Sequence, residues 1–110
     1  MSKSVFTELA RADLMEVWEW VAERSLSAAD RLLLTINEDT HTLAQQPLMV
    51  RERPELRVGL RSWPTSTAYI LYCVPDQDGL ILVRVLHHAR DIQPLDVVHS
   101  PPEGTFKFLE

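Results

Sequence analysis

One short segment holds the side chains best suited to chemistry. Residues 86–92 read Leu-His-His-Ala-Arg-Asp-Ile and directly follow an apolar stretch that is typical of a strand. An imidazole can transfer a proton near neutral pH, and a guanidinium can bind phosphate or carboxylate. Polar side chains at the end of a strand lie at the rim of a sheet, where partners are met. His87, His88, Arg90 and Asp91 are therefore candidate partner-binding residues, although Asp91 could instead cap backbone amides and Arg90 could pair with a helix acid.

The sequence lacks the usual patterns of a metal site or of a nucleophilic enzyme. On a strand the side chains of His87 and His88 would point to opposite faces and could not ligate one metal ion. His41 and His99 are too scattered to give a zinc-ligand spacing. There is no Gly-rich phosphate loop and no nucleophile elbow, and Cys73 lies in an apolar run typical of a core strand. We therefore expect no metal, no cofactor and no confident catalytic residue.

Composition indicates one folded domain. The chain has 110 residues, of which 45% are hydrophobic and 25% charged, as is ordinary for a domain with a single core. One cysteine excludes a disulfide framework and fits a reducing compartment. The sequence has neither an apolar run that could span a bilayer nor the apolar core of a signal peptide. We expect a cytoplasmic protein without a membrane partner.

The charge balance argues against tight binding to nucleic acid. The chain has 11 Lys and Arg against 16 Asp and Glu, a net charge of −5, whereas binding to phosphates rests on basic side chains. Direct DNA binding by the chain alone is not expected. Residues 51–61 differ, with four arginines against two glutamates. A positive patch on an acidic body suits a protein partner, so Arg57 and Arg61 are candidate contacts, although a solvated strand is the alternative.

Apolar residues at helical spacing predict a first helix after a short opening strand at residues 3–6. Thr7 is a plausible N-cap, and the helix should end near Arg24. Acidic residues, Asp13 among them, fall mostly on the opposite side of the helix from its apolar stripe. The stripe comprises Ala10, Leu14, Val17, Trp18 and Val21.

A second helix should follow almost at once. Ser27 is expected to cap it, with Asp30 at its N3 position as in a capping box. Pro47 should stop it, because proline cannot continue the hydrogen-bond ladder. Only a few residues separate the two predicted helices, which implies an antiparallel helical hairpin.

After Pro54 the hydrophobic period changes to two, which predicts strands. Residues 56–61 alternate apolar side chains with arginine and glycine, as expected of a strand with one wet face, and Trp63-Pro64 should end that strand. Two further strands are predicted at residues 68–74 and 80–88, joined by a hairpin loop at 75–79.

This element order predicts an α+β fold. The N-terminal strand and an antiparallel helical hairpin should pack on one face of an antiparallel sheet, in the order β-α-α-β-β-β. Residues 1–92 are expected to form the folded domain. Residues 93–110, which hold three prolines, are expected to be an extended C-terminal tail, and residues 105–109 could add an edge strand or dock on a partner.

The order and spacing of several short segments carry a family resemblance. The predicted hairpin carries Ala12-Asp13-Leu14 before Val17-Trp18, and Ser27-Ala28-Ala29-Asp30-Arg31 before Leu43-Ala44 and Pro47. The predicted strands carry Glu55-Leu56-Arg57, Leu60-Arg61 and Tyr69-Ile70-Leu71-Tyr72 before the 86–92 segment. Together, residues 3–92 resemble the RelE/ParE toxin superfamily of type II toxin–antitoxin systems, closer to ParE, whose usual ending is histidine, a small residue and Ala-Arg-Asp. His88 departs from the family, which often has glycine there.

The resemblance implies one of two activities. RelE-like members are metal-independent endonucleases that cut mRNA in the ribosomal A site, whereas ParE-like members bind DNA gyrase and trap it on cleaved DNA. In RelE-like enzymes an arginine opens the segment that here begins at Tyr69, and a phenol supplies no permanent positive charge. A ribonuclease would have to use Arg61, Arg84 and His87 in its place. Because an acidic protein also fits the ribosome poorly, we favour a gyrase inhibitor that blocks replication. The alternatives are a ribonuclease and an inactive or retargeted member that only binds an antitoxin.

The resemblance also implies a cognate antitoxin, ParD-like or of another type. A disordered antitoxin segment would fold onto the toxin and place acidic and apolar residues in a groove between helices and sheet. Arg57, Arg61 and Arg84 are candidates for charge-assisted contacts there. Trp63 is a candidate aromatic anchor, or alternatively an ordinary core residue at a strand end. A homodimer and a toxin–antitoxin heterotetramer both remain open.

Overall fold

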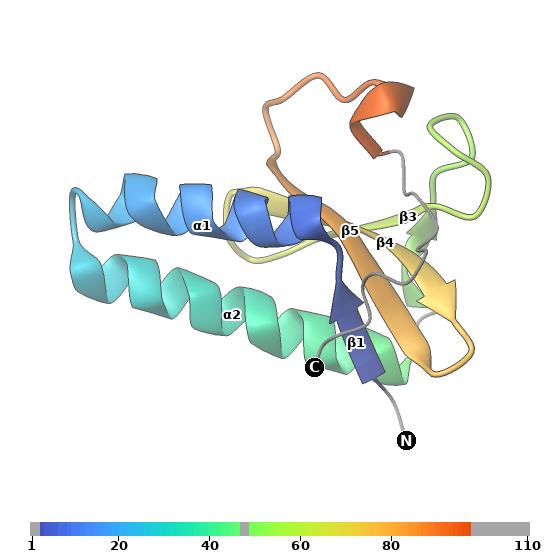
Figure 1. Ribbon diagram of the computed structural model, residues 1–110, viewed down its shortest axis with the longest axis horizontal. Helices are drawn as coiled ribbons and strands as arrows, with labels where there is room; N and C mark the ends of the chain where they lie inside the picture. The colour runs from blue at the N-terminus through green and yellow to red at the C-terminus, as the bar shows by residue number, and fades with distance from the viewer. Residues whose placement is uncertain (1–2, 47–48, 98–110) are drawn as a thin grey trace.

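Two helices lie across one face of a five-stranded sheet in the computed structural model of the protein (Figure 1). The structure describes residues 3–46 and 49–97. In chain order the elements are β1 (Lys3–Phe6), α1 (Glu8–Ala22), α2 (Leu26–Gln45), β2 (Arg51–Glu52), β3 (Arg61–Pro64), β4 (Tyr69–Asp76), β5 (Gly79–His87) and the 3-10 helix η2 (Pro94–Val97). The predicted α+β class and the helical hairpin are confirmed. Within the described ranges, no helix is long and apolar enough to cross a membrane.

The sheet is mixed, with the strand order β1-β5-β4-β3-β2. Strands β2 to β5 pair antiparallel with their neighbours, whereas β1 pairs parallel with β5. The prediction of a wholly antiparallel sheet is wrong at this one pairing. The helical hairpin carries the chain from β1 across the sheet to β2 at the far edge, so no tight turn forces β1 to run against β5.

The first helix begins where the sequence predicts, and the second begins two residues earlier. Thr7 caps α1 as predicted, since its hydroxyl accepts a hydrogen bond from a first-turn amide at 3.1 Å. The cap of α2 is Ser25, whose hydroxyl likewise accepts from a first-turn amide at 3.1 Å. The prediction of Ser27 as cap, with Asp30 at N3, is wrong because the helix already begins at Leu26. Asp30 instead accepts a hydrogen bond from the indole of Trp18 at 3.0 Å, which ties α2 to α1.

The strand predicted from residue 56 to Trp63-Pro64 is confirmed only from Arg61 onward, and residues 56–60 form a turn region. Pro54 has no amide hydrogen for a ladder, and Gly59 takes a φ of 86°, a left-handed conformation that glycine adopts readily. Val58, read as the buried side of a strand, is 89% exposed. The strand itself is β3 and begins at Arg61. The hairpin between β4 and β5 is tighter than predicted, because Asp76 already pairs with Gly79.

Apolar side chains cover both faces of the sheet. The first core, between helices and sheet, is built around Ala10, Ile36, Leu43, Leu71, Leu82 and Val85. The second core, on the opposite face, is built around Leu60, Tyr72, Val83, Leu86 and Val97. Residues 94–97, the first part of the predicted extended tail, form η2, and the side chain of Val97 is fully buried. Residues 98–110, including 105–109, lie outside the described residues, and the domain boundary at residue 92 remains a prediction.

Candidate functional site

An exposed cluster of rings forms where β5 ends. His87 is the last residue of β5 and pairs with Tyr69, the first residue of β4. Their rings meet edge to face with centroids 5.3 Å apart. The ring of His88 stacks on that of His87 at 4.6 Å, so the prediction that these two side chains point to opposite faces is wrong. The reason is that His88 lies beyond the strand, where alternation no longer applies.

A hydrogen-bonded turn follows the histidines and contains the other residues of the predicted partner-binding segment. Arg90 forms an ion pair with Asp96 at 2.9 Å, and its side chain is about half exposed. The backbone amide of Gln93 donates to Asp96 at 2.9 Å, and this hydrogen bond lowers the pKa of the Asp96 carboxyl. Asp91 is exposed and accepts from the side-chain amide of Gln93. Hydrogen bonds and an ion pair therefore hold the residues that follow β5 at the rim of the sheet.

A hollow of about 670 Å³ separates this rim from α1. The sheet side of this rim hollow includes Tyr69, His87 and Arg90. The helix side includes Glu16 and Trp20, and Trp20 is 56% exposed. Aromatic and charged groups line one open concavity, a combination that occurs at the energetic centres of protein interfaces.

Arg84 forms a buried ion pair with Asp13. Its guanidinium donates to both carboxylate oxygens of Asp13 on α1, from Nε at 2.8 Å and from Nη2 at 2.9 Å. The side chains of Arg84 and Asp13 are 13% and 8% exposed. The hydrogen bond with Asp13 raises the pKa of Arg84. Asp13 also accepts from the Val85 amide, and Arg84 donates to the carbonyl of Asp96.

The three residues that a ribonuclease would need do not converge. Arg61 donates to the carbonyl of Val50 at 2.9 Å and pairs with Glu52 at 3.0 Å, near the β2 edge of the sheet. Arg84 is bound to α1, and His87 belongs to the exposed rings. Within residues 3–46 and 49–97, these three share no hydrogen-bond, ion-pair or ring partner.

The lone cysteine is a core residue. Cys73 is fully buried in the first core. Burial raises the pKa of its thiol to about 12, so the thiolate that a nucleophile needs is suppressed at neutral pH. This agrees with the interpretation of Cys73 as a core residue.

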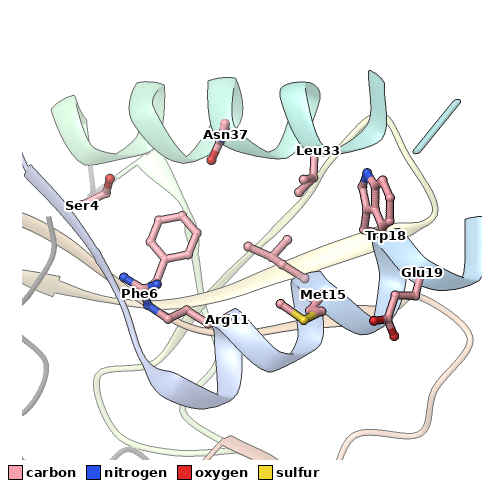
Figure 2. Close-up of a pocket in the computed structure, with 9 residues that line it drawn as sticks. Ser4, Phe6, Arg11, Met15, Trp18, Glu19, Leu33 and Asn37 are labelled. Atoms are coloured by element: carbon pink, nitrogen blue, oxygen red, sulfur yellow. The ribbon is translucent and has the colours of Figure 1, made fainter. Parts of the chain in front are cut away.

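A second groove, of about 680 Å³, lies between α1, α2 and β1. Figure 2 shows Phe6, Met15 and Leu33 in this helix groove, with Trp18 near one end. Met15 is 63% exposed although it is apolar. The residues that α1 contributes here are Arg11, Leu14, Met15, Trp18 and Glu19, none of which lines the rim hollow. The two concavities therefore use different faces of α1.

Comparison with known proteins identifies the family to which this chain belongs. Residues 5–92 match the model of the ParE toxin of type II toxin–antitoxin system, parDE. The chain belongs to the ParE toxin family. It is 26% identical over 92 residues to Toxin ParE1 of Mycobacterium tuberculosis, in two strains, over 83% of this chain and 94% of the relative. A chain of the chromosomal ParDE TA system from P. aeruginosa has the same fold, with a TM-score of 0.67 and 19% identity over 79% of this chain and 96% of that one.

The ParE match confirms the family that the sequence resembles, and the chain is a ParE-type toxin of a type II toxin–antitoxin system. The match to the family model ends at Ile92, so η2 lies beyond the matched part. The P. aeruginosa chain is matched over 96% of its length and this chain over 79%. Most of the residues outside the structural match therefore belong to this ParE protein.

The structure separates the candidate partner-binding residues of this ParE protein into three groups. His87 and Arg90 line the rim hollow, with His88 and Asp91 exposed beside them. Arg57 donates a hydrogen bond to the carbonyl of Val97, a residue of the second core. Arg61, Arg84 and Trp63 are hydrogen-bonded or packed against the first core.

The sequence predicted a groove between helices and sheet, but none of its candidate contact residues lines the helix groove. Leu14 and Trp18 were predicted to lie on the buried stripe of the first helix, and Met15 falls outside that stripe. An apolar residue on the polar side of an amphipathic helix was the available signal, since such a residue has no core to enter. Phe6 carried no such signal, because only the packing of β1 beside α1 brings it to the groove.

Proposed function

We propose that this ParE-type toxin acts in the cytoplasm by binding DNA gyrase and not by cutting RNA. The observation that supports this is the separation of Arg61, Arg84 and His87, two of which are occupied by internal partners. Cleavage of RNA without a metal needs cations gathered at the phosphate to stabilise the charge that develops there. Arginines that are bound to Asp13 and Glu52 neutralise the protein's own carboxylates and are not available for that role.

The rim hollow is the surface that we assign to gyrase. It presents exposed rings and a half-exposed guanidinium between α1 and the ends of β4 and β5. Aromatic and arginine side chains often supply most of the energy of an interface. The overall negative charge is consistent with a protein target in preference to the phosphate backbone of DNA or RNA.

The test is a pair of assays with the purified full chain. With DNA gyrase, micromolar toxin should reduce supercoiling and accumulate cleaved DNA covalently bound to the enzyme. In a translation extract the same preparation should leave mRNA intact. Unchanged supercoiling without trapped cleavage would reject gyrase as target, and toxin-dependent cleavage of mRNA would establish the ribonuclease instead.

The helix groove is the site that we propose for the antitoxin. It is apolar, it lies beside the edge strand β1, and it is large enough for several side chains. An antitoxin segment that folds on binding could bury apolar residues against Met15 and Leu33 and pair with the strand edge. This differs from the sequence expectation, which relied on Arg57, Arg61 and Arg84, because those arginines lie away from the groove. A toxin–antitoxin heterotetramer would include this contact.

Met15→Glu is expected to weaken antitoxin binding at least about tenfold, because a carboxylate would have to be desolvated in the apolar groove. Calorimetry with the antitoxin encoded beside the toxin gene measures this affinity. Met15 is 63% exposed in the free chain, so the substitution should leave the fold intact.

Leu34→Glu is the matched control for Met15→Glu. Leu34 is also an exposed apolar helix residue, 57% exposed, but it does not line the groove. Its replacement should leave antitoxin affinity unchanged. Equal loss of affinity in both variants, or in neither, would mean that the antitoxin binds elsewhere.

A further inference from the structure

The outer edge of β1 is open among the described residues. β1 is the first strand of the sheet and pairs only with β5, through residues 3–6. The Thr7 amide donates to the carbonyl of Leu82 on β5 at 3.1 Å. Because backbone polar groups alternate along a strand, the amides and carbonyls of Ser4 and Phe6 face away from β5. An open strand edge is a template for one more strand.

The helix groove lies on the helix side of this same edge. Ser4 and Phe6, two residues apart on β1, both line the groove. A strand added beside β1 would therefore direct every second side chain into the groove, next to Phe6, Met15 and Leu33. The occupant that fits should carry large apolar residues at a spacing of two.

The described chain ends within reach of this edge. The carbonyl of Asp96 in η2 accepts from Arg84 at 2.9 Å, and Val97 packs in the second core with Val83. These β5 residues immediately follow Leu82, where the pairing with β1 ends. Residues 98–104 can span up to about 23 Å when extended. That length suffices to pass around a neighbouring strand, since strands lie roughly 5 Å apart.

The last residues of the chain have the required pattern. Residues 105–110 read Thr-Phe-Lys-Phe-Leu-Glu, which places Phe106, Phe108 and Glu110 on one face of an extended strand. Arg11 lines the groove and has a charge opposite to that of Glu110. We propose that residues 105–109 of the same chain add a strand to the outer edge of β1 and insert Phe106 and Phe108 into the helix groove.

This cis-docked strand would compete with the antitoxin. The consequence rests on the proposed function, in which the helix groove is the antitoxin site, whereas docking itself is independent of it. Antitoxin would have to displace a segment held at a high effective concentration by its short connection. The free toxin would thereby keep its apolar groove and strand edge covered, which limits aggregation.

Hydrogen exchange on the full chain without antitoxin tests the docking. The Ser4 and Phe6 amides should exchange at least about tenfold more slowly in the wild type than in the Phe106→Ser/Phe108→Ser variant, because only the wild type pairs them. A synthetic peptide of residues 103–110, added to that variant, should restore the protection. Lys107→Ser is the matched control, since Lys107 would point away from the groove, and it should retain wild-type protection.

Two results would overturn the proposal. Equal exchange in wild type and in the double variant would show that residues 105–109 do not cover β1. Protection that declines when the protein is diluted would show that the segment docks on a second copy. Docking is measured here without antitoxin, so its failure would leave the Met15 and gyrase experiments unaffected.

Discussion

Asp13→Ala is expected to lower the free energy of unfolding by about 3–5 kcal/mol, because it leaves a buried guanidinium without its counter-ion. Arg84 donates two hydrogen bonds to Asp13, and both side chains are largely buried. The Val85 amide loses its acceptor as well. A domain of this size has about 5–15 kcal/mol of stability in total, so the loss should be plain in a urea titration.

A double variant separates the buried charge from the packing around it. Asp13→Leu/Arg84→Met removes both charges and fills similar volume, so it should recover much of the loss caused by Asp13→Ala. Glu55→Gln is the surface control, because the Arg53–Glu55 ion pair is exposed on the Glu55 side and should contribute little. If the double variant were as unstable as Asp13→Ala, the ion pair itself would not be the reason for the loss.

Asp13 also illustrates what the sequence can and cannot predict. Apolar periodicity predicted both helices and the strands β4 and β5, because each element shows its buried face in local spacing. Asp13 was placed on the polar side of α1, yet it is 6% exposed. The partner that makes its burial favourable is Arg84, 71 residues further along the chain. The spacing of residues within one helix or strand cannot predict an ion pair between residues so far apart in the sequence.

Local conformation explains why residues 56–60, predicted as the first half of a strand, are not in one. The alternation of Leu56, Val58 and Leu60 is real, but Leu56 and Leu60 enter the second core from a turn, and Val58 points to solvent. Pro54 and Gly59 were the residues to weigh against the alternation, because each disfavours a regular ladder. The parallel pairing of β1 with β5 could not be predicted, since both directions bury the same residues.

The candidate site was predicted in part. Residues 86–92 were identified from composition at the end of a strand, and the structure places His87 and Arg90 beside a hollow. Arginine was the least reliable guide, because its planar group binds internal carboxylates and carbonyls as readily as it binds a partner. Arg57, Arg61 and Arg84 all donate to groups of this chain. Which arginines are engaged internally is a property of the tertiary fold.

His87→Ala/His88→Ala is expected to reduce the potency of gyrase inhibition by at least about thirtyfold, the effect of losing about 2 kcal/mol at the centre of an interface. The two rings are exposed, stacked on each other and braced by Tyr69, so they are presented in a fixed orientation. Their removal takes nothing from either core, and the melting temperature should change little. Supercoiling inhibition as a function of toxin concentration measures the potency.

His41→Ala is the control of the same residue type, because His41 is exposed on α2 and lies outside both concavities. It should poison gyrase as the wild type does. Since the rim hollow and the helix groove use different α1 residues, Met15→Glu should retain gyrase inhibition while it loses antitoxin affinity, and the histidine variant should show the reverse. A histidine variant with undiminished potency would remove the rim from the gyrase contact. A variant that lost both activities together would indicate a single shared surface and contradict the assignment of separate partners to the two faces of α1.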